Sequence, residues 1–339
     1  MENTNLEKEN KDLPSSEELF EQKVLEASNK IGEVINEVHK KIVGQDELIK
    51  SMIIGLLSKG HILIEGVPGL AKTLTVDTLS KTLNLGFNRV QFTPDLLPSD
   101  LVGTEIYNPK TGEFSIKKGP IFNNFILADE INRAPSKVQS ALLEAMAEKQ
   151  ITIGKDTFKL DEPFIVLATQ NPIEQSGTYR LPEAQLDRFM MKVNVDYVKK
   201  ENEKEMYKKI NSGYDDIKIN KVLSKKEIKD IQSILNDIYV SDSIYDYVAD
   251  LIDVTRNGDI KGVSEYISYG ISPRGGLSLI SGAKVLALMD GRTFVIPEDV
   301  KNIAKSVLAH RLVLNYDAVV NDITSDDIVQ KILDSVKII

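Results

Sequence analysis

The sequence contains no cysteine and no tryptophan, and only three histidines among its 339 residues. Without cysteine there can be no disulfide, no thiol nucleophile and no cysteine-ligated metal. His39, His61 and His310 are scattered without the spacing of metal ligands, so we expect no histidine-built metal site.

Positive charge is also in deficit. The chain carries 42 Lys and Arg against 51 Asp and Glu, a formal net charge of -9. Because no global positive field exists to attract a phosphate backbone, nucleic acid is disfavoured as a partner. No segment approaches the run of about 18 apolar residues that would cross a bilayer, and residues 1–21 are acidic and polar. We therefore expect no membrane span and a cytoplasmic location.

The length of the chain exceeds the range in which a single core usually keeps growing, so we expect two packed units. Residues 1–14 are polar and aperiodic, which is typical of a mobile tail. From residue 15 to 197 short apolar runs alternate with helical stretches, which predicts an α/β fold with a parallel sheet. The predicted strands are residues 61–64, 89–92, 125–128, 164–168 and 190–195. Beyond Tyr197 the pattern is helical, so residues 198–339 are predicted to form a second, all-helical domain.

A glycine-containing turn at residues 66–73 lies between the first predicted strand and a helix, where a phosphate-binding loop belongs. Small residues let backbone N–H groups surround phosphates, and the helix start adds its positive dipole end. Lys72 can reach the β- and γ-phosphates, and the Thr73 hydroxyl can ligate Mg²⁺. The sequence therefore predicts an ATP site. Its binding residues are Gly66, Val67, Pro68, Gly69, Leu70, Ala71, Lys72, Thr73 and Leu74.

Ala71 stands before the lysine, where such loops usually carry glycine. We expect its methyl group to be tolerated if the residue is already helical. Taken alone, the loop could also be a turn that begins a helix by coincidence.

Two adjacent carboxylates, Asp129 and Glu130, follow the apolar strand 125–128 in a Walker B pattern. Asp129 can hold Mg²⁺, and Glu130 can orient and deprotonate the water that attacks the γ-phosphate. The alternative is a solvated acidic strand end, and the presence of the phosphate loop in the same chain makes it the weaker interpretation. We therefore predict ATP hydrolysis with ATP and Mg²⁺ as cofactors.

Three further polar residues fit the same chemistry. Asn171 follows the strand 164–168, at the sheet edge where ligands bind in open α/β folds, and could position the attacking water. Arg188 could supply positive charge to a neighbour's γ-phosphate, and Arg274 could bring a cation from the second domain. Taken singly, Asn171 is more often a turn former, Arg188 is more often part of a surface ion pair, and Arg274 is more often a solvated arginine at a capped helix start.

With these motifs in this order, the sequence resembles an AAA+ ATPase of the MoxR family over about residues 30–312. The spellings that carry the resemblance are residues 42–45, 66–73 with alanine before the lysine, 128–134, 168–172 and 181–189. In this family alanine before the lysine is the usual spelling, so Ala71 does not count against activity.

The resemblance implies an α/β nucleotide domain followed by a helical lid, and a ring, usually hexameric, with ATP bound between subunits. It implies that Asn171 is sensor 1, Arg188 the arginine finger acting in trans and Arg274 sensor 2. Val43 and Gly44 would line the adenine pocket.

The resemblance also implies a hairpin inserted at about residues 93–124, around a turn at 108–112. A second hairpin is expected at 150–160 around Gly154, and either could contact the substrate of the ring. Arg133 and Arg180 would be further interface arginines.

By analogy, such a ring remodels or matures protein partners in chaperone fashion, and its clients in this family are often von Willebrand factor A domain proteins. Three alternatives stay open: a magnesium-chelatase-like subunit, a DNA-associated motor, and a nucleotide-gated binding module that does not hydrolyse ATP. The acidic balance argues against the DNA motor.

Overall fold

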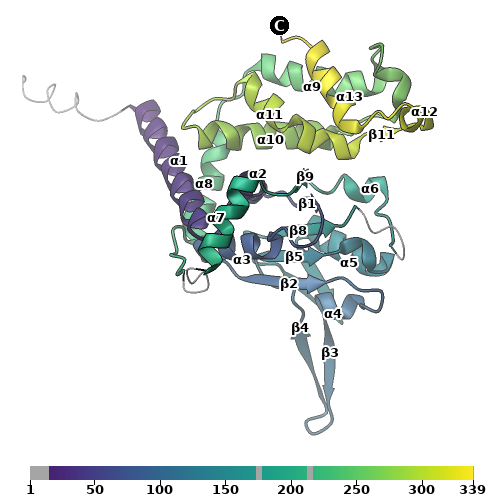
Figure 1. Ribbon diagram of the computed structural model, residues 1–339. Coiled ribbons are helices and arrows are strands. Elements are labelled where there is room, and N and C mark those ends of the chain that lie inside the picture. The colour runs from purple at the N-terminus through teal and green to yellow at the C-terminus, as the bar shows by residue number, and fades with distance from the viewer. Residues whose placement is uncertain (1–14, 173–177, 212–216, 339) are drawn as a thin grey trace, which may run out of the picture.

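The structure is a computed structural model that describes residues 15–172, 178–211 and 217–338. The predicted mobile tail, residues 1–14, lies outside the described residues. In Figure 1 a sheet-containing base lies below a layer of helices, and a long helix, α1, rises beside both.

The base is built on five parallel strands in the order β2-β5-β8-β1-β9. All five predicted strands are confirmed, with small shifts at their ends. They are β1 (Ile62–Glu65), β2 (Phe87–Gln91), β5 (Phe125–Asp129), β8 (Ile165–Gln170) and β9 (Met191–Asn194). Because all the strands run the same way, their carboxyl ends meet at one edge of the sheet.

Side chains alternate between the two faces of the sheet and feed two separate cores. Ile62 and Ile64 of β1 enter the core shared with α1 (Ser16–Lys41), α2 (Asp46–Leu57) and α3 (Lys72–Thr82). Leu63 enters the core on the opposite face, with α4 (Pro98–Val102) and α5 (Ser136–Glu148). Helices thus cover both faces, as a near-continuous apolar parallel strand requires.

Two antiparallel hairpins extend from the base, and both predictions are confirmed. The first joins β3 (Gly103–Asn108) to β4 (Glu113–Lys118) and projects away from the body of the molecule in Figure 1. Its turn closes through a hydrogen bond from Gly112 N to Asn108 O, with Gly112 at φ 72°. The second joins β6 (Gln150–Ile153) to β7 (Asp156–Lys159).

After β9 the described chain is largely helical. A short helix, α6 (Glu183–Leu186), precedes β9, and η1 (Ile131–Arg133) follows β5. The later helices are α7 (Lys200–Asn211), α8 (Lys225–Asp237), α9 (Asp242–Asn257), η3 (Ser264–Tyr266), α10 (Pro273–Met289), α11 (Pro297–Leu308), η4 (Ala309–Arg311), α12 (Tyr316–Val320) and α13 (Ser325–Ser335).

The expectation of an all-helical second domain misses one detail. β10 (Ile267–Tyr269) pairs antiparallel with β11 (Val313–Leu314). Segments this short leave no alternating pattern to read in a sequence.

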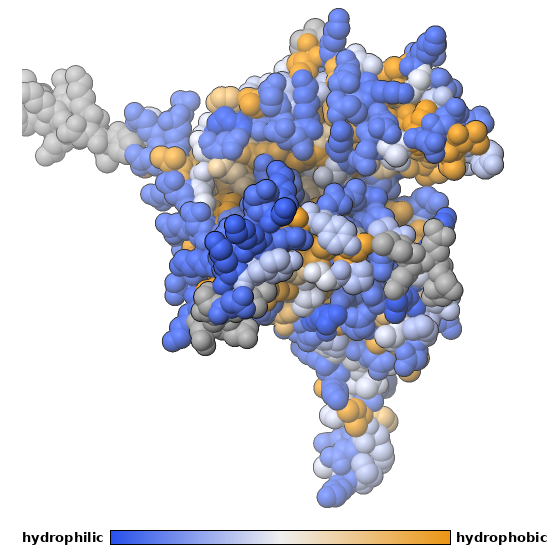
Figure 2. Space-filling view, viewed as in Figure 1, coloured by the Kyte–Doolittle hydropathy of each residue, from blue (hydrophilic) through white to orange (hydrophobic). Residues whose placement is uncertain are grey.

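The helical layer packs directly onto the base. α10 contacts α1 and α2, and α11 contacts β9, so one apolar core runs through both parts. Within the described ranges, no helix combines the length and the apolar run needed to cross a bilayer. Figure 2 shows a mostly hydrophilic face, with apolar side chains gathered around α12, where Val319 and Val320 are exposed.

Candidate functional site

The glycine turn at residues 66–71 leads from β1 into α3, and hydrogen bonds from Gly66 and Lys72 hold it. Gly66 N donates to Gln170 O at 3.2 Å. A Cβ at Gly66 would lie 2.5 Å from Val195 O, closer than side-chain carbons come to backbone oxygens, so only glycine fits here. Lys72 Nζ donates to Gly66 O at 2.6 Å, so the lysine head lies against the turn.

Ala71 corrects one expectation. It is not in a right-handed helical conformation but has φ 54° and ψ 19°, in the left-handed region. This conformation costs a non-glycine residue about 1 to 2 kcal/mol. Its carbonyl accepts hydrogen bonds from Thr75 N and Thr75 Oγ1, each at 2.9 Å, so the start of α3 holds Ala71 in place.

The two carboxylates follow β5 and are fixed by the neighbouring strand β8. Thr169 Oγ1 donates to Asp129 Oδ1 at 2.6 Å and accepts from Glu130 N at 2.8 Å. Glu130 has φ 58°, a strained left-handed conformation of the kind that persists at functional sites. One buried hydroxyl therefore sets the positions of both acids.

Two side chains of β2 also hold the acids, and the sequence analysis missed both. Arg89 donates to Asp129 Oδ2 from Nε at 3.0 Å and from Nη2 at 2.6 Å. Gln91 Nε2 donates to Glu130 Oε2 at 2.7 Å. The signal was available, because β2 is another strand that ends in polar residues at the same sheet edge.

These groups surround a cavity of about 430 Å³ at the carboxyl edge of the sheet. Eleven predicted site residues line it: Gly66, Pro68, Gly69, Leu70, Ala71, Lys72, Thr73, Leu74, Asp129, Glu130 and Asn171. Arg89, Gln91, Thr169 and Gln170 complete the lining.

Val67, Val43 and Gly44 do not line this cavity. Val43 and Gly44 lie between α1 and α2. A Cβ at Gly44 would lie 3.1 Å from atoms of Val198 and Asn202, so this segment faces the start of α7.

Charge in the cavity is arranged around Lys72. Burial lowers the pKa of Lys72, and the carboxylates of Asp129 and Glu130 oppose that fall. A cation flanked by two acids at a helix start suits a ligand that brings both anionic oxygens and a metal ion.

The donor set fits Mg²⁺, which prefers oxygen ligands and is usually bound by one or two protein groups together with phosphates. Thr73, which carries a hydroxyl, and Asp129, which carries a carboxylate, both line the cavity. Across the described part of the chain, no cluster of three His, Cys, Asp or Glu could hold a metal alone.

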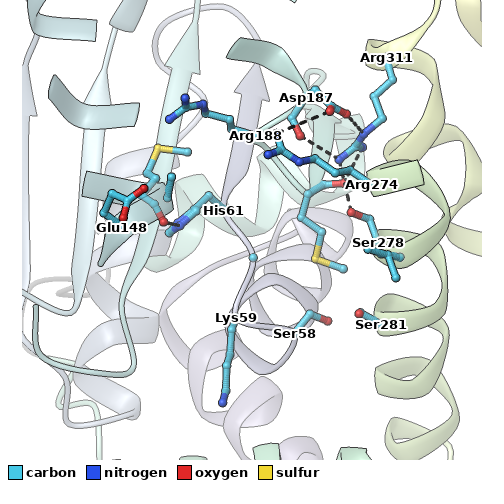
Figure 3. Close-up of a pocket in the computed structure, with 15 residues that line it drawn as sticks. Ser58, Lys59, His61, Glu148, Asp187, Arg188, Arg274, Ser278, Ser281 and Arg311 are labelled. Carbon is cyan, nitrogen blue, oxygen red and sulfur yellow. Dashed lines mark hydrogen bonds and ion pairs between the residues drawn. The ribbon is translucent and has the colours of Figure 1, made fainter. Parts of the chain in front are cut away.

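Arg188 and Arg274 lie elsewhere, in a second cavity of about 480 Å³ between the base and the helical layer. Arg188 Nη1 donates to Leu143 O at 2.7 Å, and Arg274 Nη1 lies 3.8 Å from Asp187 Oδ2. Figure 3 shows Arg274 and Arg311 directed toward Asp187, whereas the Arg188 side chain extends away from it. Neither Arg188 nor Arg274 lines the cavity at the phosphate turn of its own chain.

Comparison with known proteins agrees with this geometry. Residues 61–191 match the family described as "ATPase family associated with various cellular activities (AAA)", and residues 261–332 match the AAA lid domain. The chain is 46% identical over 305 residues to the chaperone MoxR1 of Mycobacterium tuberculosis, covering 89% of this chain and 80% of the relative. It is 39% identical over 308 residues to the YeaC protein of Bacillus subtilis, covering 91% and 94%.

A crystal structure of a protein from Cytophaga hutchinsonii, described as a candidate ATPase, is 50% identical and superposes with a TM-score of 0.87. The match covers 94% of this chain and 98% of that one. The sheet order, the lid and the relatives agree: the chain belongs to the MoxR family of AAA+ ATPases.

Proposed function

We propose that this protein binds ATP with Mg²⁺ at the phosphate turn and hydrolyses it. The observation that carries the proposal is the convergence of Lys72, Asp129 and Glu130 on one cavity at the carboxyl edge of a parallel sheet. A loop lysine and two strand-end acids, brought together from segments far apart in sequence, form the set that phosphoryl transfer to water needs.

Each residue has a role in the proposed reaction. Glu130 is the general base, and its carboxylate is oriented by Gln91 and by Arg133, whose Nε lies 3.2 Å from Glu130 Oε2. Asn171, at the end of β8, positions the attacking water. Thr73 and Asp129 would hold Mg²⁺, which would neutralise phosphate charge. Val43 and Gly44 contact the adenine.

The opposite wall of the site comes from a neighbouring subunit. AAA+ proteins generally form rings, and we propose a hexamer here. Arg188 and Arg274 lie together in a cavity separate from the phosphate turn of their own chain. Both are exposed, so they can meet the γ-phosphate bound by the next copy, where added positive charge accelerates transfer. We propose that residues 15–197 form the nucleotide domain, with an insert at 93–124, and residues 198–339 the lid.

The proposed work of the ring is chaperone-like remodelling or maturation of protein partners, including von Willebrand factor A domain proteins. One relative is named a chaperone. The projecting β3–β4 hairpin, with Tyr107 and Phe114 exposed at a ring separation of 5.2 Å, offers a surface for protein contact.

Two variants test the hydrolytic proposal. Glu130→Gln should keep ATP affinity while lowering turnover by about 10² to 10⁴, the usual worth of a general base. Lys72→Ala should weaken ATP binding itself. Equal turnover in Glu130→Gln and in the parent protein would show that Glu130 is not the general base. The Glu130→Gln protein held in ATP is also the form with which to capture clients.

A further inference from the structure

One side chain at the junction of lid and base is buried and charged, yet it has no place in the reaction described so far. The side chain of Arg311, in η4 of the lid, is only 2% exposed. A buried guanidinium is costly unless it is paired and its N–H groups are satisfied. The groups that pair with Arg311 therefore indicate which segments it holds together.

Three of those partners lie in the four residues between α6 and β9, the segment that contains Arg188. Arg311 Nε donates to Asp187 Oδ1 at 2.9 Å, Nη2 to Phe189 O at 2.7 Å, and Nη1 to Met190 O at 2.9 Å. Both chain neighbours of Arg188 are thus held by one planar group, whose fork fixes direction as well as distance.

The same guanidinium is anchored to the lid. Nη1 donates to Val307 O at the end of α11, and Nη2 donates to Ser278 Oγ of α10 at 3.3 Å. Asp187 receives a second lid contact, from Ser272 Oγ at 2.9 Å. Ser272 is the N-cap of α10 and also accepts from Arg274 N, so the lid arginine is tied to the same acid.

We infer that Arg311 is a positioning residue that joins the lid to the 187–190 segment, so that Arg188 and Arg274 are presented to a neighbouring subunit as one unit. This inference rests on the proposed shared site and adds a residue that touches no nucleotide. Arg311 acts through the Asp187 carboxylate (Figure 3) and through the carbonyls of Phe189 and Met190.

Arg311→Lys is the decisive variant, because an ammonium keeps the charge but cannot reproduce the five-donor fork. Turnover should fall on the order of 10- to 100-fold, the effect of a misplaced catalytic group. The Kd for ATP should stay within about 2-fold, because the phosphate turn of the same chain is untouched. Arg292→Lys is the matched control. Arg292 pairs with Asp299 at 2.7 and 2.8 Å entirely within the lid, so its loss should leave turnover within about 2-fold.

Mixing subunits separates positioning from general support of the fold. Arg311→Lys subunits keep Glu130, and Glu130→Gln subunits keep a well-placed Arg188, so mixed rings should regain turnover at about one quarter of the interfaces of a 1:1 mixture. A chain that is merely destabilised would show dilution without recovery. If Arg311→Lys does not fold, Asp187→Asn makes the same prediction with the guanidinium retained.

Arg188→Ala, mixed in the same way, reports on the shared site itself. Recovery with both variants supports the inference. Recovery with Arg188→Ala but not with Arg311→Lys overturns the role of Arg311 and leaves the shared site standing. Recovery with neither, in rings shown to exchange subunits, overturns the shared site and the inference together.

Discussion

Replacing Gly66 by alanine tests whether close backbone approach, rather than backbone flexibility, requires glycine at the start of the phosphate turn. The new Cβ would lie 2.5 Å from Val195 O and 3.2 Å from Val195 Cβ. Val195 N is itself bonded to Glu65 O at 2.7 Å, so the oxygen cannot swing aside without disturbing the pairing of β1 with β9. Overpacking of this kind costs about 1 to 3 kcal/mol.

Thermal melting and ATP titration measure the effect. Each kcal/mol should lower Tm by roughly 2 to 4 °C in a unit of this size. Because Lys72 Nζ bonds Gly66 O, the displaced turn should also weaken ATP binding by about 10-fold, or about 1.4 kcal/mol.

Two other glycines serve as matched controls. Gly32 in α1 has nothing within 4 Å of a new Cβ, so Gly32→Ala should stabilise the helix by about 0.5 to 1 kcal/mol. Gly69 also has open space but φ +88°, so Gly69→Ala should cost about 1 to 2 kcal/mol through the backbone alone. If Gly66→Ala melts and binds ATP like the parent, the steric account is wrong.

Further predictions concern pH and metal. His61 donates from Nε2 to Met146 O and accepts from Val166 N at Nδ1, which only the neutral ring can do, and burial lowers its pKa to about 4. Below the usual pKa of 6.5 the unfolded chain therefore binds a proton that the folded chain does not. The free energy of unfolding should fall by about 1.4 kcal/mol for each pH unit between 6.5 and about 4. Urea unfolding at several pH values in this window gives the slope of the free energy of unfolding against pH, which should be shallower by that amount in His61→Gln. An unchanged slope would contradict a buried, neutral His61. Removing Arg89 from Asp129 should lower the Mg²⁺ concentration needed for ATP binding by up to about 5-fold, the worth of a half-exposed pair of about 1 kcal/mol. A Mg²⁺ titration with a fluorescent ATP analogue measures this concentration. A higher Mg²⁺ requirement in Arg89→Ala would show that Arg89 does not compete with Mg²⁺ for Asp129.

Much of the fold follows from local patterns in the sequence. Apolar runs bounded by glycine and polar residues located all five strands, because fully buried parallel strands tolerate few other residues. The hairpin turn at residues 108–112 was also readable, since Gly112 supplies the left-handed backbone that closes it. β10 and β11 were missed, because strands of two or three residues are too short to show an alternating pattern.

The site was only partly readable for a different reason. Motifs identify residues that are close in sequence, whereas Arg89 reaches Asp129 across 40 positions and Arg311 reaches Asp187 across 124. The place of Arg89 at the polar end of a strand could have indicated the site, but its partner could not be read from the sequence, and nothing in the sequence distinguishes Arg311 from a solvated arginine. The left-handed Ala71 shows the converse: the motif was found, but its backbone conformation depends on the hydrogen bonds that begin α3.

The most direct test of the shared ATP site is the turnover of mixed rings made from Arg188→Ala and Glu130→Gln subunits, each nearly inactive alone. Where an Arg188→Ala subunit supplies the phosphate turn and a Glu130→Gln subunit supplies the arginine, the site is complete, and about one quarter of the interfaces in a 1:1 mixture should be of this kind. We predict turnover well above the sum of the two separate proteins. Turnover that never exceeds that sum at any ratio, in rings shown to exchange subunits, would contradict a site divided between neighbours.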